Sequence, residues 1–299
     1  MPLSLNIVDS PSVPIRHLDA LWFQVAGTRC NLTCSHCFIS CSPHNHSFGF
    51  LDLATVECHL AESIPLGVKE YYFTGGEPFL NPDMVAILER TLAVGPATVL
   101  TNGTVLRDDW LHRLRAAADA SIYSLEFRVS LDGACASDND PIRGEGTFAR
   151  ILAGVKRLLD FGFLPILTVT KTRDDQDDAE LFSEFVAMLK AIGYTRPRVK
   201  ILPTLRLGAE ASRQRGYNGD ERVTDEMLAD FDMNLLVCSN SRTVTDRGVF
   251  TCPILIESPV ARLGATLAGS LRPAPLSNAA CYTCWQHGAL CSNVTPKPE

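Results

Sequence analysis

Predicted strands and amphipathic helices alternate along the first two thirds of the sequence, and this alternation restricts the fold most strongly. Short apolar runs are each followed by a polar turn and a segment with apolar residues at i, i+3 and i+4 spacing. The predicted strands are residues 21–25, 70–73, 98–100, 125–131, 166–169 and 199–202, and the predicted helices include 84–92, 110–117, 148–161 and 179–192. This pattern predicts βαβ units around a parallel sheet, which is an α/β fold. Six units favour a partial (β/α)6 barrel, because a full barrel takes about 250 residues.

The pattern changes after residue 202, and this change predicts the domain organisation. Residues 208–220 are polar and rich in Gly and Arg, and residues 225–231 favour a short helix. From residue 235 the sequence is punctuated by Pro and Gly and is rich in cysteine. We therefore expect an N-terminal segment at 1–20, a core at 21–220 and a small cysteine-rich extension at 221–299.

Composition narrows the classes of partner and the cellular location. The chain has 299 residues and a net charge of −7, so it lacks the basic surface that binding to nucleic acid requires. No run of about 18 apolar residues predicts a membrane span. The N-terminus shows no charged-then-apolar signal pattern, so we expect a cytoplasmic protein with neither a nucleic-acid nor a membrane partner.

Eleven cysteines are many for such a chain, and their odd number argues against a framework of disulfides. Cys30, Cys34 and Cys37 follow the first predicted strand with C-x3-C-x2-C spacing. Three thiolates on one loop can hold three irons of a [4Fe–4S] cluster and leave the fourth open to a chelating ligand. A zinc site is the alternative, although zinc ligands usually come as two separated cysteine pairs.

The cysteine triplet, with His36 at its aromatic position, resembles the C-x3-C-x-aromatic-C signature of the radical S-adenosylmethionine superfamily. This resemblance implies that the open iron binds the amine and carboxylate of S-adenosylmethionine. Reduction by one electron then cleaves a C–S bond and gives a 5′-deoxyadenosyl radical, which abstracts a hydrogen atom from a substrate. Cys41 follows closely and is interpreted as lying outside the ligand set, because a fourth thiolate would close the open iron.

Two further motifs extend the resemblance over residues 21–205. Gly75, Gly76 and Glu77 follow the second strand in the sequence TGGEP, which resembles the superfamily motif that contacts the methionine amino group. Glycines at that point let backbone carbonyls approach a ligand. Ser130 and Arg143 follow the fourth strand and resemble the pair that holds the methionine carboxylate, a role suited to the planar guanidinium. The resemblance therefore implies cofactor contacts at His36, Gly75, Gly76, Glu77, Ser130 and Arg143.

The C-terminal cysteines predict a second metal site. Residues 246–252 favour a hairpin that delivers Cys252, and Cys281 and Cys284 form a later C-x2-C pair. With Cys238 they can enclose a four-thiolate site, for which iron–sulfur and zinc remain alternatives. The arrangement resembles the twitch and SPASM extensions that carry auxiliary [4Fe–4S] clusters, and the cysteine count fits one such cluster. Cys291 is a spare or a substitute ligand.

These motifs together predict a radical S-adenosylmethionine oxidoreductase or transferase with one auxiliary cluster and an electron donor such as flavodoxin or ferredoxin. The short segment before the first strand favours a small-molecule substrate over a peptide, with a peptide-modifying maturase as the alternative. A non-catalytic iron–sulfur electron carrier or zinc-binding scaffold is the alternative outside enzymes. No side chain is assigned a catalytic role.

Overall fold

The computed structural model describes residues 10–172, 176–288 and 290. Within them the main sheet has nine strands in the order β10-β9-β8-β2-β3-β4-β5-β6-β7. The strands are β2 (Ala20–Gln24), β3 (Glu70–Thr74), β4 (Ala97–Thr101), β5 (Leu125–Ser130), β6 (Ile166–Thr170), β7 (Arg198–Leu202), β8 (Ser241–Thr245), β9 (Gly248–Phe250) and β10 (Arg262–Gly264). From β8 to β7 they are parallel, whereas β9 and β10 pair in antiparallel fashion at one edge.

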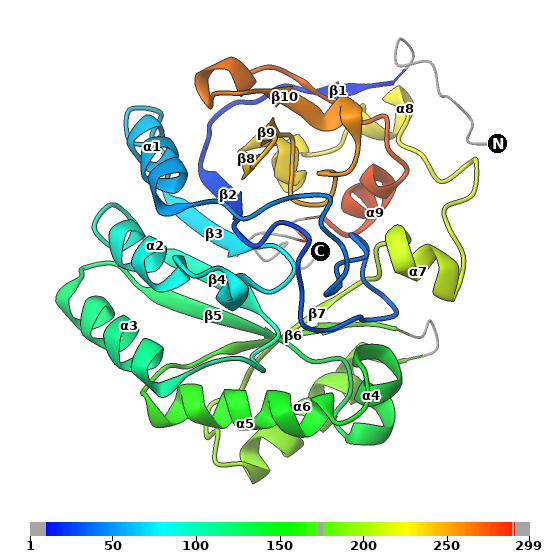
Figure 1. The fold of residues 1–299 in the computed structure, drawn as a ribbon. Coiled ribbons are helices and arrows are strands. Elements are labelled where there is room, and N and C mark those ends of the chain that lie inside the picture. The colour runs from blue at the N-terminus through cyan, green and yellow to red at the C-terminus, as the bar shows by residue number, and fades with distance from the viewer. Residues whose placement is uncertain (1–9, 173–175, 289, 291–299) are drawn as a thin grey trace.

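Helices connect the parallel strands and cover the outer side of the curved sheet (Figure 1). The α-helices are α1 (Leu53–Ser63), α2 (Met84–Thr91), α3 (Asp108–Ala120), α4 (Ala136–Arg143), α5 (Thr147–Asp160), α6 (Asp178–Ala191), α7 (Gly208–Arg213), α8 (Asp225–Leu228) and α9 (Ala280–His287). The short 3₁₀ helices are η2 (Pro78–Leu80), η3 (Met233–Leu235), η4 (Val237–Ser239), η5 (Pro259–Ala261) and η6 (Ala268–Ser270). None of the helices in the described part of the chain has both the length and the apolar character of a membrane span.

Both faces of the central strands are buried, as a parallel sheet requires. Alternate side chains of β2, such as Leu21 and Phe23, enter the core beneath the helices. Trp22 points to the opposite face and stacks on Tyr72 with ring centroids 4.3 Å apart. This continuous burial explains why the strands are nearly uninterrupted apolar runs in the sequence.

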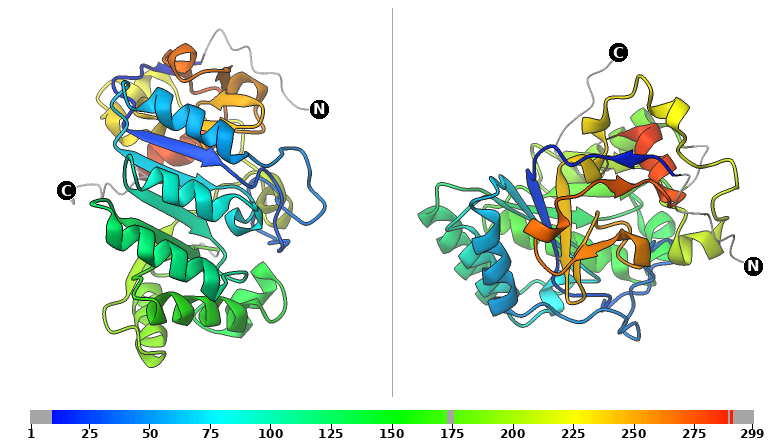
Figure 2. Two further views of the ribbon diagram at one scale, coloured as in Figure 1. Left: turned by 60° about the vertical axis from the view of Figure 1, so that its left-hand side comes forward. Right: turned by 90° about the horizontal axis from the view of Figure 1, so that it is seen from above.

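A second core joins the loop after β2 to the C-terminal segment. It contains Cys30, Leu32 and Phe48 from the loop together with Phe250 and Cys281 from the C-terminal segment. A two-stranded sheet of β1 (Ser12–Val13) and β11 (Ala274–Pro275) also links the two ends of the described chain. Figure 2 shows the C-terminal elements, coloured yellow to red, gathered around the end of the sheet that holds β2.

The predicted α/β fold with a partial barrel is confirmed, and the sheet does not close into a full barrel. Each of the six predicted strands coincides with one of β2 to β7. The expected hairpin at 246–252 is formed by β8 and β9. The sequence did not predict that β8 pairs in parallel with β2, from Ala20 opposite Ser241 to Phe23 opposite Val244. The proposed division at residue 220 stays a prediction.

Candidate functional site

The predicted cluster ligands lie in the loop that follows β2, at the carboxyl end of the parallel strands. Cys30, Cys34 and Cys37 all line one cavity of about 230 Å³, here called the cofactor cavity. Its other lining residues are Leu32, His36, Phe38, Cys41, Gly75, Gly76, Leu100, Asn102, Ser130, Arg143, Thr168, Thr170, Leu202, Pro203 and Leu205. The structure therefore brings the triplet together with five of the six predicted cofactor contacts.

Each thiol of the triplet has a distinct set of hydrogen-bond donors. Cys30 Sγ accepts from the Leu32 N–H at 3.4 Å and from Asn102 Nδ2 at 3.7 Å. Burial nevertheless raises the pKa of Cys30 to about 12. Burial also raises the pKa of Cys34, against the opposing effect of the Arg143 guanidinium, which lies 4.0 Å from its sulfur. Cluster binding must therefore release protons from these two thiols.

Cys41 lies in the same cavity and acts on Cys37. Its backbone N–H donates to Cys37 Sγ at 3.3 Å, and its thiol hydrogen-bonds the same sulfur. These hydrogen bonds lower the pKa of Cys37, although burial opposes them. The interpretation of Cys41 as lying outside the ligand set stays a prediction.

The two glycines of TGGEP allow the end of β3 to pack directly on the cluster loop. A Cβ on Gly76 would lie 1.9 Å from the Arg29 carbonyl oxygen, and a Cβ on Gly75 would lie 2.8 Å from the Ala26 nitrogen. The Gly76 N–H donates to the Gly27 carbonyl at 3.0 Å. The glycines thus position the cysteine loop, in addition to the predicted approach of their backbone to a ligand.

Glu77 is fully buried and is not part of the cavity lining. Its carboxylate accepts hydrogen bonds from the Thr101 hydroxyl and the Asn102 N–H, both at 2.7 Å, and so holds the turn after β4. Burial raises the pKa of Glu77 to about 7, in opposition to these donors. Its predicted direct contact with the cofactor stays a prediction.

Asp132 links two of the predicted cofactor contacts. Its carboxylate lies 3.0 Å from His36 Nε2 and 2.6 Å from Arg143 Nε, and the Asp132 side chain is completely buried. Burial alone would raise the pKa of Asp132, but the Arg143 guanidinium and His36 hold it well below its usual range. Asp132 thereby fixes the orientation of both side chains at the cavity wall.

Three buried polar atoms of the lining residues have no hydrogen-bond partner within the described structure. One of them, Arg143 Nε, is ion-paired with Asp132, whereas His36 Nδ1 and Thr168 Oγ1 have neither kind of partner. Buried polar groups without partners are rare and often mark a ligand site. Three thiols, two glycines and two orphaned polar atoms therefore fit an iron–sulfur cluster with a polar ligand beside it.

Asp132, Asn102 and Thr168 also belong to the site, although no role was assigned to them from the sequence. Asp132 lies two residues after Ser130 in the sequence, and Asn102 lies in a Thr-Asn-Gly turn at the end of a predicted strand. Their position at the carboxyl ends of strands was the available signal, because sites of such folds form on that face. Thr168 lies within β6 and carried no such signal.

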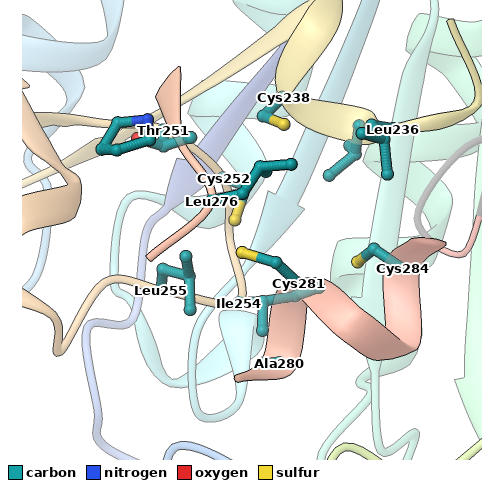
Figure 3. Close-up of a pocket in the computed structure, with 12 residues that line it drawn as sticks. Leu236, Cys238, Thr251, Cys252, Ile254, Leu255, Leu276, Ala280, Cys281 and Cys284 are labelled. Atoms are coloured by element: carbon teal, nitrogen blue, oxygen red, sulfur yellow. The ribbon is translucent and has the colours of Figure 1, made fainter. Parts of the chain in front are cut away.

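The four predicted C-terminal ligands line a second, small pocket, here called the cysteine pocket. Figure 3 shows the sulfurs of Cys252 and Cys281 turned toward each other, with Cys238 and Cys284 facing the same space. The other walls are apolar side chains such as Leu236 and Leu276. Four thiols around one dry pocket match the donor set of a four-thiolate site, of either iron–sulfur or zinc type. Cys291 lies outside the described residues.

Burial favours the protonated form of three of the four pocket thiols in the absence of metal. It raises the pKa of Cys238 to about 12 and that of Cys252 to about 11, and it also raises the pKa of Cys281. Across residues 10–172, 176–288 and 290, no three His, Cys, Asp or Glu side chains converge closely enough to hold a single metal ion. The thiols of a cubane bind different irons and surround a larger volume than the ligands of one ion.

Comparison with known proteins places these features in a family. The family model described as "Radical SAM superfamily" matches residues 25–185. Mycofactocin maturase MftC of Mycolicibacterium smegmatis is 26% identical over 291 residues, which are 87% of this chain and 68% of the relative. The MftC of Mycobacterium ulcerans is 30% identical over 180 residues, and the match covers only 45% of that relative. GTP 3′,8-cyclase of Tolumonas auensis is 30% identical over 164 residues, which are 54% of this chain and 47% of the relative.

A solved structure shares the fold. The crystal structure of Streptococcus suis SuiB bound to S-adenosylmethionine matches 83% of this chain and 62% of that chain, with a TM-score of 0.61 and 14% sequence identity. The family model covers more than half of the chain, including the cysteine triplet, the TGGEP turn and the Ser130–Arg143 segment. Members of this family use a [4Fe–4S] cluster together with S-adenosylmethionine. The chain belongs to the radical SAM superfamily.

Proposed function

We propose that Cys30, Cys34 and Cys37 hold a [4Fe–4S] cluster and that S-adenosylmethionine binds beside it in the cofactor cavity. The observation that carries this proposal is the convergence of the three thiols with Gly75, Gly76, Ser130 and Arg143 on that cavity. When bound, the cluster and S-adenosylmethionine supply a 5′-deoxyadenosyl radical by reductive C–S cleavage. The chain then serves as an enzyme that abstracts a hydrogen atom from a substrate.

The protein side chains orient the cofactor in this proposal. Arg143, held by Asp132, offers its guanidinium to the methionine carboxylate, and Ser130 supplies a neighbouring hydroxyl. His36 and Thr168 offer buried polar atoms that lack partners in the described structure. Apolar residues, among them Leu100 and Leu202, limit access of water to the cavity, as a radical reaction requires.

The cysteine pocket supports an auxiliary [4Fe–4S] cluster held by Cys238, Cys252, Cys281 and Cys284. These residues belong to the proposed domain 221–299, and helix α9 supplies two of them. A small reduced electron carrier, such as flavodoxin or ferredoxin, is proposed as the electron donor. The thiolates required at both sites persist in a reducing compartment, so a cytoplasmic location is part of the proposal. The acidic net charge supports the absence of a nucleic-acid partner.

A polar cavity of about 240 Å³ is the proposed substrate site. Its lining includes Lys171, Arg206, Glu221 and His287, and Pro203 lines both this cavity and the cofactor cavity. Helix α9 contributes to both the polar cavity and the cysteine pocket. A cavity of this size and polarity suits a small polar molecule, which is the first candidate.

A peptide is the second candidate substrate, and one comparison favours it. The match to the relative named a maturase extends over 87% of this chain, whereas the match to the relative named GTP 3′,8-cyclase covers 54%. On this alternative the polar cavity receives one side chain of a peptide.

Anaerobic reconstitution with iron, sulfide, S-adenosylmethionine and a reductant tests the proposed chemistry. We expect about eight irons per chain and formation of 5′-deoxyadenosine. Replacing Cys30, Cys34 and Cys37 by Ala should remove about four irons and abolish 5′-deoxyadenosine. The Cys281→Ala, Cys284→Ala chain should also lose about four irons but should keep cleavage of S-adenosylmethionine. A reconstituted protein that makes no 5′-deoxyadenosine would refute the proposal.

Fractionated cell extract separates the two substrate candidates. A substrate is expected to raise 5′-deoxyadenosine formation above the rate seen without it. If the stimulating fraction has a low molecular weight and survives protease digestion, the substrate is a small molecule. If digestion destroys the stimulation, the substrate is a peptide or protein.

A further inference from the structure

Arg242 is a completely buried arginine at the start of the strand that joins the C-terminal segment to the main sheet. Its guanidinium donates four hydrogen bonds, and every acceptor is a backbone carbonyl. Nε donates to Ser270 at 3.0 Å and Nη2 to Arg272 at 2.8 Å. Nη1 donates to Ser241 at 2.7 Å and to Cys238 at 2.9 Å.

Four of the five N–H groups of the Arg242 guanidinium have acceptors, but its charge is not balanced by a carboxylate. No ion pair within the described part of the chain involves Arg242, whereas the other buried arginines, Arg128 and Arg143, each face a carboxylate. Burial of an unpaired charge is costly, so such charges are retained mainly where an opposite charge is present. Arg272 lies close enough to add further positive potential.

The groups that can supply the opposite charge are the thiols of the cysteine pocket. Arg242 holds the carbonyl of Cys238, whose thiol lines the pocket. Arg242 Nη1 lies 2.9 Å from that carbonyl oxygen, and the pocket beside it also contains the thiols of Cys252, Cys281 and Cys284. A buried cation is therefore placed where thiolates would form on metal binding.

We propose that Arg242 is the counter-charge of the metal site in the cysteine pocket, and that it raises the reduction potential of the auxiliary [4Fe–4S] cluster held there. This inference rests on the proposed function, because it assumes iron–sulfur rather than zinc at that site. Arg242 is a positioning residue that does not touch the cluster sulfurs. It acts through its charge and through the Cys238 backbone.

The direction of the effect follows from electrostatics. A four-thiolate cluster carries net negative charge, and each added electron makes it more negative. A fixed positive charge in a dry environment stabilises the reduced form more than the oxidised form. The auxiliary cluster thus becomes a better acceptor for an electron than the same four cysteines would make alone.

Potentiometric titration of the auxiliary cluster, followed by electron paramagnetic resonance, tests the inference. The full chain with Cys30, Cys34 and Cys37 replaced by Ala isolates this cluster. In that background Arg242→Gln removes the charge and keeps amide donors, whereas Arg242→Lys keeps a charge. Arg262→Gln, at an exposed arginine on β10, is the matched control.

We expect Arg242→Gln to shift the reduction equilibrium at least tenfold toward the oxidised cluster, which is about 59 mV for a one-electron couple. Arg262→Gln should leave the potential unchanged. Equal potentials for Arg242→Gln and the parent, with the cluster present in both, would overturn the inference and leave the proposed function intact. A parent that binds zinc or no metal would overturn the auxiliary cluster and this inference together.

The Arg242→Lys protein provides the same test if Arg242→Gln does not fold. A buried lysine loses its proton within an accessible pH range, since burial lowers its pKa. Its cluster potential should therefore fall as the pH is raised through that pKa, while the parent potential changes less over the same range. Identical pH profiles for the two proteins would contradict a role for charge at position 242.

Discussion

Asp132 illustrates how one buried residue organises several others at the cofactor cavity. The sequence motif directed attention to Ser130 and Arg143, whereas the carboxylate that clamps Arg143 and His36 lies between them in the chain. The polar sequence of residues 130–143 does not reveal which of its side chains is buried. The orientation of Asp132 depends on two neighbouring elements: Arg143 of α4 pairs with its carboxylate, and the Thr170 N–H of β6 donates to it at 3.0 Å.

Replacement of Asp132 by Asn should destabilise the chain strongly. Arg143 would keep its charge in a buried site without its partner, so we expect the free energy of unfolding to fall by about 3–5 kcal/mol. Urea unfolding of the metal-free chain measures this. Asp109→Asn is the control, because its ion pair with Arg107 is exposed and should contribute less than about 1 kcal/mol. Similar losses for both variants would show that Asp132 is not a buried clamp.

The stabilising effect of Asp132 should also depend on pH. The Asp132 pKa is depressed in the folded chain, so its stabilising effect is present above the unfolded-state pKa of about 3.9. The effect is lost as the pH falls through the folded-state pKa. The stability difference between parent and Asp132→Asn should therefore stay constant from about pH 5 to 8 and shrink below about pH 4. A difference that grows in acid would contradict this assignment.

Gly76→Ala should disrupt the first cluster without changing any ligand. The added Cβ would lie 1.9 Å from the Arg29 carbonyl oxygen and 2.7 Å from the Cys30 nitrogen, so the cysteine loop must shift. We expect the iron content after reconstitution to fall by about four per chain. Gly219→Ala, where no atom lies within 4 Å of the new Cβ, should keep its iron. Full iron loading of Gly76→Ala would show that the loop position is not critical.

At the scale of elements, the β8–β9 hairpin supports the loop that carries the first cysteines. The Gly49 N–H donates to the Asp246 carboxylate at 2.8 Å, and Arg247 stacks over the Phe48 ring at 4.5 Å. Phe48 also packs edge-on against Phe250 with centroids 6.1 Å apart. The loop after β2 and the β8–β9 hairpin, which leads to Cys252, therefore contact each other through side chains outside both proposed ligand sets.

Phe48→Ala tests this connection. Removal of a buried phenylalanine leaves a cavity and costs about 3–5 kcal/mol, here at the junction of loop and hairpin. We expect the variant to lose iron from its first site to a chelator faster than the parent does, although all ligands remain. Phe182→Ala, at a ring that is 44% exposed on α6, should lose iron at the parent rate. Equal rates for Phe48→Ala and the parent would contradict the connection.

The elements that could be predicted are those whose signal is local. The strands β2, β3, β4 and β6 are short and mostly apolar, whereas β5 and β7 alternate apolar with charged residues. Helix α6 begins at the N-cap Asp177, whose carboxylate accepts from the Ala179 and Glu180 N–H groups. Helix α4 was not predicted, because it contains Pro141 and has too few apolar residues to show the helical i, i+3, i+4 spacing. Helix α7 was missed for a similar reason, within the Gly- and Arg-rich stretch.

At the scale of the whole molecule, the main sheet runs through both predicted segments. β2 has β3 on one side and β8 on the other, although β8 belongs to the C-terminal segment. Sequence patterns predict that these strands exist but not which strands pair. The pairing of two strands more than 200 residues apart produces no pattern in the spacing of apolar residues. The cysteine spacing predicted which thiols gather. Arg242 was missed because its position follows from that long-range pairing, and Asp132 was missed because its partners come from the cysteine loop, α4 and β6.

A chain that ends at residue 220 tests the predicted boundary. Such a chain would leave β2 unpaired on its β8 side along Ala20–Phe23. It would also expose Phe48 and Cys30, which the C-terminal segment covers in the full chain. We expect it to aggregate and to bind no cluster, in contrast to the full chain expressed in parallel. A folded 1–220 product that binds four irons would instead establish the core as an independent domain.

The pairing of β2 with β8 also determines when the protein can mature during its synthesis. The ribosome releases Ala20 long before Ser241, with a delay on the order of 10–40 s at ordinary translation rates. Throughout that interval the first three ligand cysteines are present without the C-terminal segment, whose Phe250 and Cys281 share a buried cluster with Cys30. Delivery of iron and sulfide is therefore expected to follow completion of the chain, and nascent chains are the form most exposed to damage by oxygen.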